Sequence, residues 1–195
     1  MTKTLNQYNL TSFQLIEKAI ANGEAKLSST GAIYITTGKR SGRSPQDRFI
    51  VQEPTTADSI DWGSINRPID ATTFDTLWDR VFDYLANKER YVSHLHISQD
   101  DHHYIPVRVI TETAWHGLYA NNMFVKKPSY NPLSKKPWTI LHAANFVCVP
   151  KRDGTNSDGA VITDFSQRKV LLAGMAYAGE MKKAMFSVLN FLLSK

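Results

Sequence analysis

The sequence has 195 residues, of which 42% are hydrophobic and 21% are charged, a balance that excludes a chain disordered throughout. No apolar run approaches the ~20 residues of a membrane span, and the N-terminus has neither the basic nor the apolar region of a secretory signal, so we expect a cytoplasmic protein without membrane contact. The formal net charge of +5 comes from scattered basic pairs rather than one basic tract, which favours small anionic substrates over nucleic acid.

Four segments have the apolar spacing of helices. The first begins at Thr11, which has capping-box spacing to Gln14, and its apolar face is expected to include Phe13. The other three are expected over residues 73–87, over residues 113–124 and from Gly179 onward. The second has the most regular apolar stripe, so we expect it to face the core.

Between the helices lie runs of mostly β-branched and aromatic residues bounded by turn residues, which predict strands. They are residues 32–36, 49–52, 91–97, 107–110, 138–141, 145–149, 160–163 and 169–172. Residues 152–159 are a loop by composition. Helices interleaved irregularly with strands predict a single α/β (α+β-like) domain, in which helices cover a mixed β-sheet. The last helix runs to the final residue without a polar linker, so we expect 1–195 to be part of a longer chain.

The first candidate site is the segment 36–48, which places two glycines and four cations between two expected strands. It is not a phosphate-binding P-loop, because Ile33 stands where that motif requires glycine. Ser44 and Asp47 have the spacing of a capped helical turn, so free backbone N–H groups are expected beside Arg43. A carboxylate or phosphate would bind there. The alternative is a basic turn on the surface.

The second candidate site is the start of the last helix, residues 177–183. Lys182 and Lys183 face the positive end of the helix macrodipole there, which costs up to ~1 kcal/mol each. Two lysines at this position are therefore unfavourable for the helix unless a bound anion compensates their charge. The alternative is a solvated helix face that tolerates both lysines.

The third candidate site contains His94 and His96 on one strand face, followed by Asp100, His102 and His103. These ligand types suit zinc. The alternative is an amphipathic strand followed by a polar turn, which explains the same residues without a metal.

Three other reactive residues are expected to be structural. Cys148 lies in an apolar run and is expected to be a buried, inert thiol. His116 and His142 are accompanied by no nucleophile motif, so they are expected to be ordinary helix or strand residues.

Residues 37–51 read Thr-Gly-Lys-Arg-Ser-Gly-Arg-Ser-Pro-Gln-Asp-Arg-Phe-Ile-Val. This segment is similar to the Thr-Gly-Lys-x-x-Gly-Arg-Ser-Pro-x-Asp segment of ATP-dependent phosphoenolpyruvate carboxykinases. Further matches follow in the family's order at residues 106–115, 152–157 and 177–190. The resemblance therefore covers nearly the whole chain, from Leu10 to Leu193.

Enzymes of this family convert oxaloacetate and ATP to phosphoenolpyruvate, carbon dioxide and ADP in gluconeogenesis, using divalent manganese or magnesium. The resemblance implies that Arg43 and Lys183 are catalytic and that Arg43 binds the substrate carboxylate. It implies that Tyr177 and Lys182 also line the substrate pocket. Lys183 would contact substrate and nucleotide phosphate, and would ligate manganese through a neutral amine.

The resemblance also implies that residues 1–195 are the substrate-binding N-terminal domain. The family's nucleotide-binding domain, with its P-loop and other metal ligands, would lie beyond Lys195, so these residues alone are expected to bind no ATP and to be inactive. We expect the apolar side of the last helix, with Val188, Leu189 and Leu192, to be partly exposed and to promote self-association. Two alternatives stay open: a standalone dicarboxylate-binding or interaction module, and a basic nucleic-acid-binding domain.

Overall fold

The computed structural model describes residues 6–100, 102–126 and 136–194. Within these ranges a sheet of eight strands has the order β1-β6-β7-β8-β10-β9-β4-β5. The strands are β1 (Asn6–Tyr8), β4 (Arg48–Val51), β5 (Arg67–Ile69), β6 (Arg90–Ile97), β7 (Ile105–Thr111), β8 (Trp138–Ala143), β9 (Ala160–Asp164) and β10 (Lys169–Ala173). A separate antiparallel hairpin contains β2 (Ala25–Leu27) and β3 (Ile33–Ile35).

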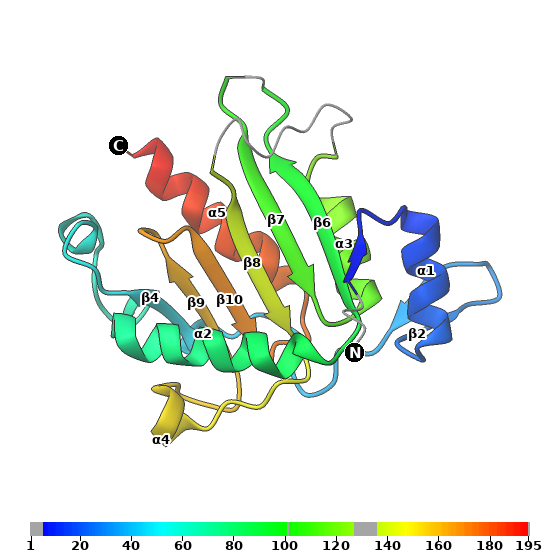
Figure 1. The fold of residues 1–195 in the computed structure, drawn as a ribbon, viewed down its shortest axis with the longest axis horizontal. Helices are drawn as coiled ribbons and strands as arrows, with labels where there is room; N and C mark the ends of the chain where they lie inside the picture. Colours follow the sequence, from blue (N-terminus) through cyan, green and yellow to red (C-terminus); the bar gives the residue numbers. More distant parts are fainter. Residues whose placement is uncertain (1–5, 101, 127–135, 195) are drawn as a thin grey trace.

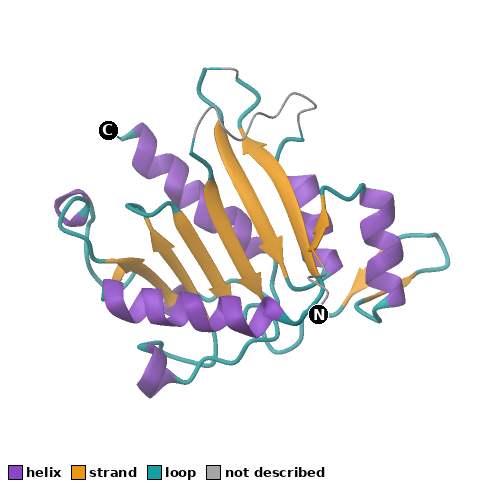
Figure 2. Ribbon diagram, in the orientation of Figure 1, coloured by secondary structure: helices purple, strands orange, loops and turns teal. Residues whose placement is uncertain are grey.

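Helices cover both faces of this sheet (Figure 1). They are α1 (Ser12–Ala21), α2 (Ala71–Ala86), α3 (Ala114–Met123), the single turn α4 (Pro150–Asp153) and α5 (Gly179–Leu193). The helix α2 packs on one face, whereas α3 and α5 pack on the other, and Figure 2 shows the strands enclosed between them. Pairing is antiparallel for β6–β7 and β10–β9 and parallel for β7–β8 and β8–β10. The expected mixed sheet covered by helices is therefore confirmed.

The helix α2 is positioned by its cap and by its apolar stripe. The Asp70 side chain accepts the Thr73 backbone N–H at 3.0 Å, which satisfies one of the free donors at the helix start. Phe74, Leu77 and Val81 are then buried against the sheet, each no more than 1% exposed. The expected core-facing stripe is confirmed.

The helix α1 begins as expected but buries a different face. Thr11 and Gln14 form the predicted capping box. Leu15 and Ala19 are the buried residues, whereas Phe13 is 68% exposed, so the expected apolar face is wrong. The reason is tertiary, because α1 packs on α3, where Gly117 leaves room for the Leu15 side chain.

The expected strand over residues 145–149 is wrong. Phe146 and Cys148 are buried and Val147 is exposed, so the segment has the period-two burial of a strand. In the described part of the chain it pairs with no strand, and the Cys148 N–H donates to the Asp158 carbonyl at 3.0 Å instead. An extended loop that lies on the core therefore produces the same sequence pattern as a strand.

The expected exposure of α5 is only partly right. Val188 is completely buried beside Met181 and Met185, so its expected exposure is wrong, because this side of the helix packs on the sheet. Leu189 is half-buried and Leu192 is 41% exposed, as expected. Among the described helices, none is long and apolar enough to cross a membrane.

Gly174 allows the chain to turn from β10 toward α5. Its φ is +66°, and its N–H donates to the Ala143 carbonyl at 2.9 Å. A Cβ at this position would lie 2.5 Å from the Asp158 carbonyl oxygen and 2.8 Å from the Phe146 carbonyl oxygen. Both atoms belong to backbone, so neither can move aside as the end of a flexible side chain could.

We therefore expect Gly174→Ala to lower the free energy of unfolding by roughly 3 kcal/mol, from the left-handed backbone and the overpacking together. Gly31→Ala is the matched control, because Gly31 has a φ of +81° and a Cβ added there would meet no atom within 4 Å. It should cost only about 1 kcal/mol. Urea denaturation of both variants measures the difference, and equal losses would contradict the role of the backbone contacts.

Candidate functional site

The candidate site lies where two segments distant in sequence meet at one edge of the sheet. One segment precedes β4, and the other connects β10 to α5. Because β10 is antiparallel to β9 and β9 is parallel to β4, the end of β10 and the start of β4 share this edge. The strand order therefore brings the loop that carries Arg43 to the N-terminal end of α5.

A pocket of about 530 Å³ lies beside this edge, between α3 and α5. All four site residues expected from the sequence line it: Arg43, Tyr177, Lys182 and Lys183. The pocket also has an apolar wall, formed by Met123, Phe124, Val125, Met185, Phe186 and Leu189. Among the described residues no aspartate or glutamate lines the pocket. An anion that entered would meet three cations and no competing carboxylate.

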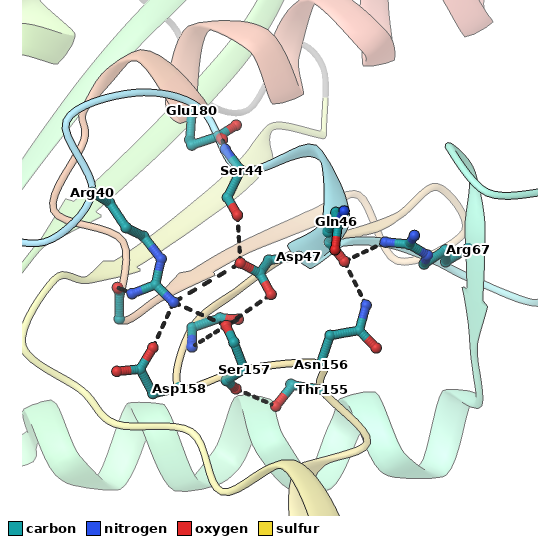
Figure 3. A network of polar contacts seen from close by, with 12 residues as sticks. Arg40, Ser44, Gln46, Asp47, Arg67, Thr155, Asn156, Ser157, Asp158 and Glu180 are labelled. Atoms are coloured by element: carbon teal, nitrogen blue, oxygen red, sulfur yellow. Dashed lines mark hydrogen bonds and ion pairs between the residues drawn. The ribbon is translucent and has the colours of Figure 1, made fainter.

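The loop that carries Arg43 is tied to two other loops at this edge (Figure 3). Arg40 donates to the Gly174 carbonyl at 3.1 Å and to Ser157 Oγ at 2.9 Å, and it forms an ion pair with Asp158. The Ser157 hydroxyl donates in turn to Asp47 Oδ1 at 2.8 Å. These contacts join the loop before β4 to the loops before β9 and after β10.

The helical turn expected after Arg43 is present, but its cap is not the expected one. Pro45–Asp47 form a 3₁₀ turn, without a side-chain cap from Ser44. The Ser44 hydroxyl instead donates to Asp47 Oδ2, and its N–H donates to Glu180 Oε1 at 2.6 Å. The Ser44 N–H, which is next to Arg43 in the chain, is therefore not free for an anion, because a buried carboxylate of the protein accepts it, and the Asp47 N–H donates to the Ser44 carbonyl.

Glu180 is the functional residue that the sequence reasoning missed. It lies in the first turn of α5, two residues before Lys182, and it is completely buried. An acidic residue in a first helical turn interacts favourably with the helix dipole, which offsets part of the cost of the two lysines. The acidic residue was visible in the sequence, but its burial against a distant loop was not.

The two lysines differ in their surroundings. Lys182 is exposed, whereas Lys183 is half-buried and its Nζ lies 4.9 Å from the centroid of the Phe186 ring. This distance is within the range of a cation–π interaction, so the aromatic ring restrains the ammonium group at the pocket wall.

Two buried histidines hold the backbone that leads into the site. His142 Nε2 lies 2.6 Å from the Met175 carbonyl, and His116 Nε2 lies 3.0 Å from the Ala176 carbonyl. Because a carbonyl oxygen can only accept, Nε2 of each histidine carries the hydrogen and donates it. The rings meet edge to face with centroids 4.1 Å apart. Both are structural, as expected, but they fix the residues immediately before Tyr177. Burial lowers the pKa of His142 to about 4 and holds the pKa of His116 well below its usual value.

The histidine-rich segment favours the polar-turn interpretation. Asp100 Oδ1 accepts the backbone N–H groups of His102 and His103, each at 2.8 Å, as a turn-forming aspartate does. His96 stacks on Tyr104, and the two ring centroids lie 4.5 Å apart. Within the described ranges, no three histidine, cysteine, aspartate or glutamate side chains gather as metal ligands.

Cys148 is buried as expected, and burial raises its pKa to about 12.

Comparison with known proteins identifies relatives over the whole chain. The family model described as phosphoenolpyruvate carboxykinase matches residues 5–195. The chain is 42% identical to the phosphoenolpyruvate carboxykinase (ATP) of Geobacillus kaustophilus, over 99% of this chain and 37% of that protein. It is 44% identical to the protein of the same name from Bacillus pumilus, over 95% of this chain and 35% of that protein. The chain thus spans little more than a third of the length of these relatives.

The histidine pair makes stability depend on pH. An imidazole in the unfolded chain takes up a proton near pH 6.5, whereas His142 in the folded chain does so only near pH 4. The stability is therefore fully present above about pH 6.5 and falls as the pH drops toward 4, by about 3 kcal/mol for this group. His116 acts in the same direction, and Glu112 partly opposes the shift of His142.

We expect His142→Gln to reduce this slope, because glutamine keeps an N–H for the Met175 carbonyl but does not titrate. The measurement is urea denaturation at several pH values between 7 and 4. His102→Gln is the matched control, since His102 is exposed, and it should keep the slope of the original chain. An unchanged slope in His142→Gln would show that another group governs the pH dependence.

Proposed function

The chain belongs to the phosphoenolpyruvate carboxykinase family, and on this premise we propose that its 195 residues are the substrate-binding part of an enzyme that converts oxaloacetate and ATP to phosphoenolpyruvate, carbon dioxide and ADP. The observation that carries the proposal is the convergence of Arg43, Tyr177, Lys182 and Lys183 on one pocket. These residues come from segments that meet only in the folded chain. Their positive charge suits an anionic substrate.

Each residue has a role that fits its chemistry. The Arg43 guanidinium can bind a carboxylate through two parallel hydrogen bonds, and the Tyr177 hydroxyl can donate a further one. Loss of carbon dioxide from oxaloacetate leaves negative charge on the enolate oxygen, which the Lys182 ammonium group at the pocket can stabilise. That oxygen would then bond to the γ-phosphorus of ATP while the bond from that phosphorus to the departing ADP breaks. Catalysis of this step rests on positioning and on fixed cations.

ATP and a divalent metal belong to the proposed reaction, ATP as the phosphoryl donor and the metal as a source of positive charge on the phosphates. Lys183 is the residue of this chain proposed to hold the metal, through its amine nitrogen, and to contact the nucleotide phosphate. Within the described residues no carboxylate joins Lys183 at the pocket, so this pocket alone is a poor metal site. We therefore propose that the 195 residues by themselves retain neither metal nor ATP.

Two further proposals concern partners and location. Self-association rests on the exposed residues of α5, Leu192 together with Phe186, which is 51% exposed. A cytoplasmic location rests on composition alone. The alternative function, a dicarboxylate-binding module without catalysis, is favoured by the same pocket, because its cations can bind a dicarboxylate without a nucleotide.

We expect Arg43→Ala to abolish the binding of phosphoenolpyruvate, which should be weak because solvent screens the charges of an open pocket. Arg43 is exposed and outside the core, so the melting temperature should change little. Calorimetric titration at low salt measures the affinity. Arg108→Ala is the control, since Arg108 is also an exposed arginine but lies on β7 outside the pocket lining. Equal affinity in the Arg43 variant and the original chain would make Arg43 irrelevant to binding.

We also expect the 195-residue polypeptide to form no phosphoenolpyruvate from oxaloacetate, ATP and Mn²⁺. Phosphoryl transfer requires the nucleotide and the metal to be held in position. We have proposed that these residues alone retain neither. A coupled assay with a full-length relative as the positive control measures this. Turnover above background that Arg43→Ala removes would overturn the expectation and assign full catalysis to these residues.

A further inference from the structure

Glu180 is a buried carboxylate that connects the two halves of the candidate site. Its side chain is 1% exposed. Oε2 accepts from Arg48 Nη2 at 2.7 Å and from Arg48 Nε at 3.2 Å, while Oε1 accepts the Ser44 N–H at 2.6 Å. Both oxygens therefore have partners, which a buried carboxylate needs.

These partners lie next to the cations of the pocket. Ser44 follows Arg43 directly in the chain, and Glu180 precedes Lys182 and Lys183 on the same helix. One hydrogen bond thus joins the backbone of the arginine loop to the helix that carries both lysines. In Figure 3 the Glu180 carboxylate lies beside the Ser44 backbone nitrogen, while the Ser44 side chain points away toward Asp47.

The loop has a second anchor on the other side of Arg43. Arg40 is bound to the Gly174 carbonyl and to Asp158. Arg43 lies between the two anchors and is itself exposed. The Arg40 anchor faces the loops before β9 and after β10. Of the two anchors, Glu180 is therefore the one that ties the arginine loop directly to α5.

We propose that Glu180 is a positioning residue that sets the distance between the Arg43 guanidinium and the amines of Lys182 and Lys183. The inference rests on the proposed function, because it assigns to Glu180 the alignment of three cations that bind one anion. Glu180 itself does not line the pocket.

The charge of Glu180 separates the proposal from a purely electrostatic effect, because the two predict opposite changes in anion affinity. A negative charge near a cationic pocket weakens anion binding, so neutralising Glu180 without any movement would tighten it. Loss of alignment has the opposite effect, because an anion could no longer reach all three cations at once. Arg48 pairs with Glu180, which leaves Arg43 free of the carboxylate.

The decisive variant is Glu180→Gln, which keeps the shape of the side chain but replaces one acceptor oxygen by an amide NH₂ group. Asp153→Asn is the matched control. Asp153 is also a buried carboxylate, 2% exposed, that accepts one backbone N–H, from Val149 at 2.7 Å, and pairs with arginine side chains, those of Arg80 and Arg152. It lies beside α2, away from the pocket lining. Both variants neutralise a buried carboxylate that pairs with arginine.

Two measurements test the proposal: calorimetric titration with phosphoenolpyruvate at low salt, and hydrogen exchange of the Ser44 amide by NMR. In Glu180→Gln we expect the Kd to rise about tenfold, as for the loss of one charged hydrogen-bond partner, and the Ser44 amide to exchange faster. Asp153→Asn should lower the melting temperature but keep both the Kd and the Ser44 exchange rate.

An equal or tighter Kd in Glu180→Gln would overturn the proposal, as would the same loss of affinity in Asp153→Asn. If the original chain does not bind phosphoenolpyruvate, the proposed function fails. The exchange rate then decides the inference alone, since unchanged protection of Ser44 would overturn it and faster exchange would support it.

If Glu180→Gln does not fold, Arg48→Lys replaces it, because lysine keeps the charge but has one nitrogen in place of the guanidinium fork. It should shift both readouts in the same direction by less, and no shift would overturn the proposal.

Discussion

The connection from β10 to α5 is the constraint on which the candidate site depends. Each backbone carbonyl from Gly174 to Tyr177 has a partner: Arg40, His142, His116 and the Glu180 N–H in turn. Four consecutive carbonyls held in this way leave the segment few alternative conformations. The position of Tyr177 and the start of α5 therefore follow from side chains that lie on other elements.

Three polar side chains around this connection, those of His116, His142 and Glu180, are costly to bury, so their contribution is to position the backbone. Two buried histidines must stay neutral, and Glu180 is a buried carboxylate that must stay paired. Replacing such groups by apolar residues often leaves stability unchanged or raises it. An apolar side chain could fill the same space, but it could not hold a carbonyl or an amide at a fixed distance and angle.

Short-range sequence patterns were sufficient to predict those elements that depend only on neighbouring residues in the chain. The capping box at Thr11, the apolar stripe of α2 and the 3₁₀ turn after Ser44 are all short-range features, and the structure contains them. Pattern failed where burial came from distant parts of the chain. The segment 145–149 has the alternation of a strand but pairs with none in the described part of the chain, and Phe13 is exposed because α1 packs through another face. The strands β1, β2 and β5, each three residues long, were not among the expected strands, whereas the equally short β3 was.

The family, the mixed sheet and the four residues of the pocket were predictable from the sequence, because motif order and local spacing are properties of the chain itself. The burial of Glu180, its contact with the Ser44 amide and the histidine pair behind Tyr177 were decided by tertiary structure alone. The physical reason is the strand order. It places the start of β4 and the end of β10 at one edge, and no local pattern encodes which distant backbone amide a glutamate will meet there.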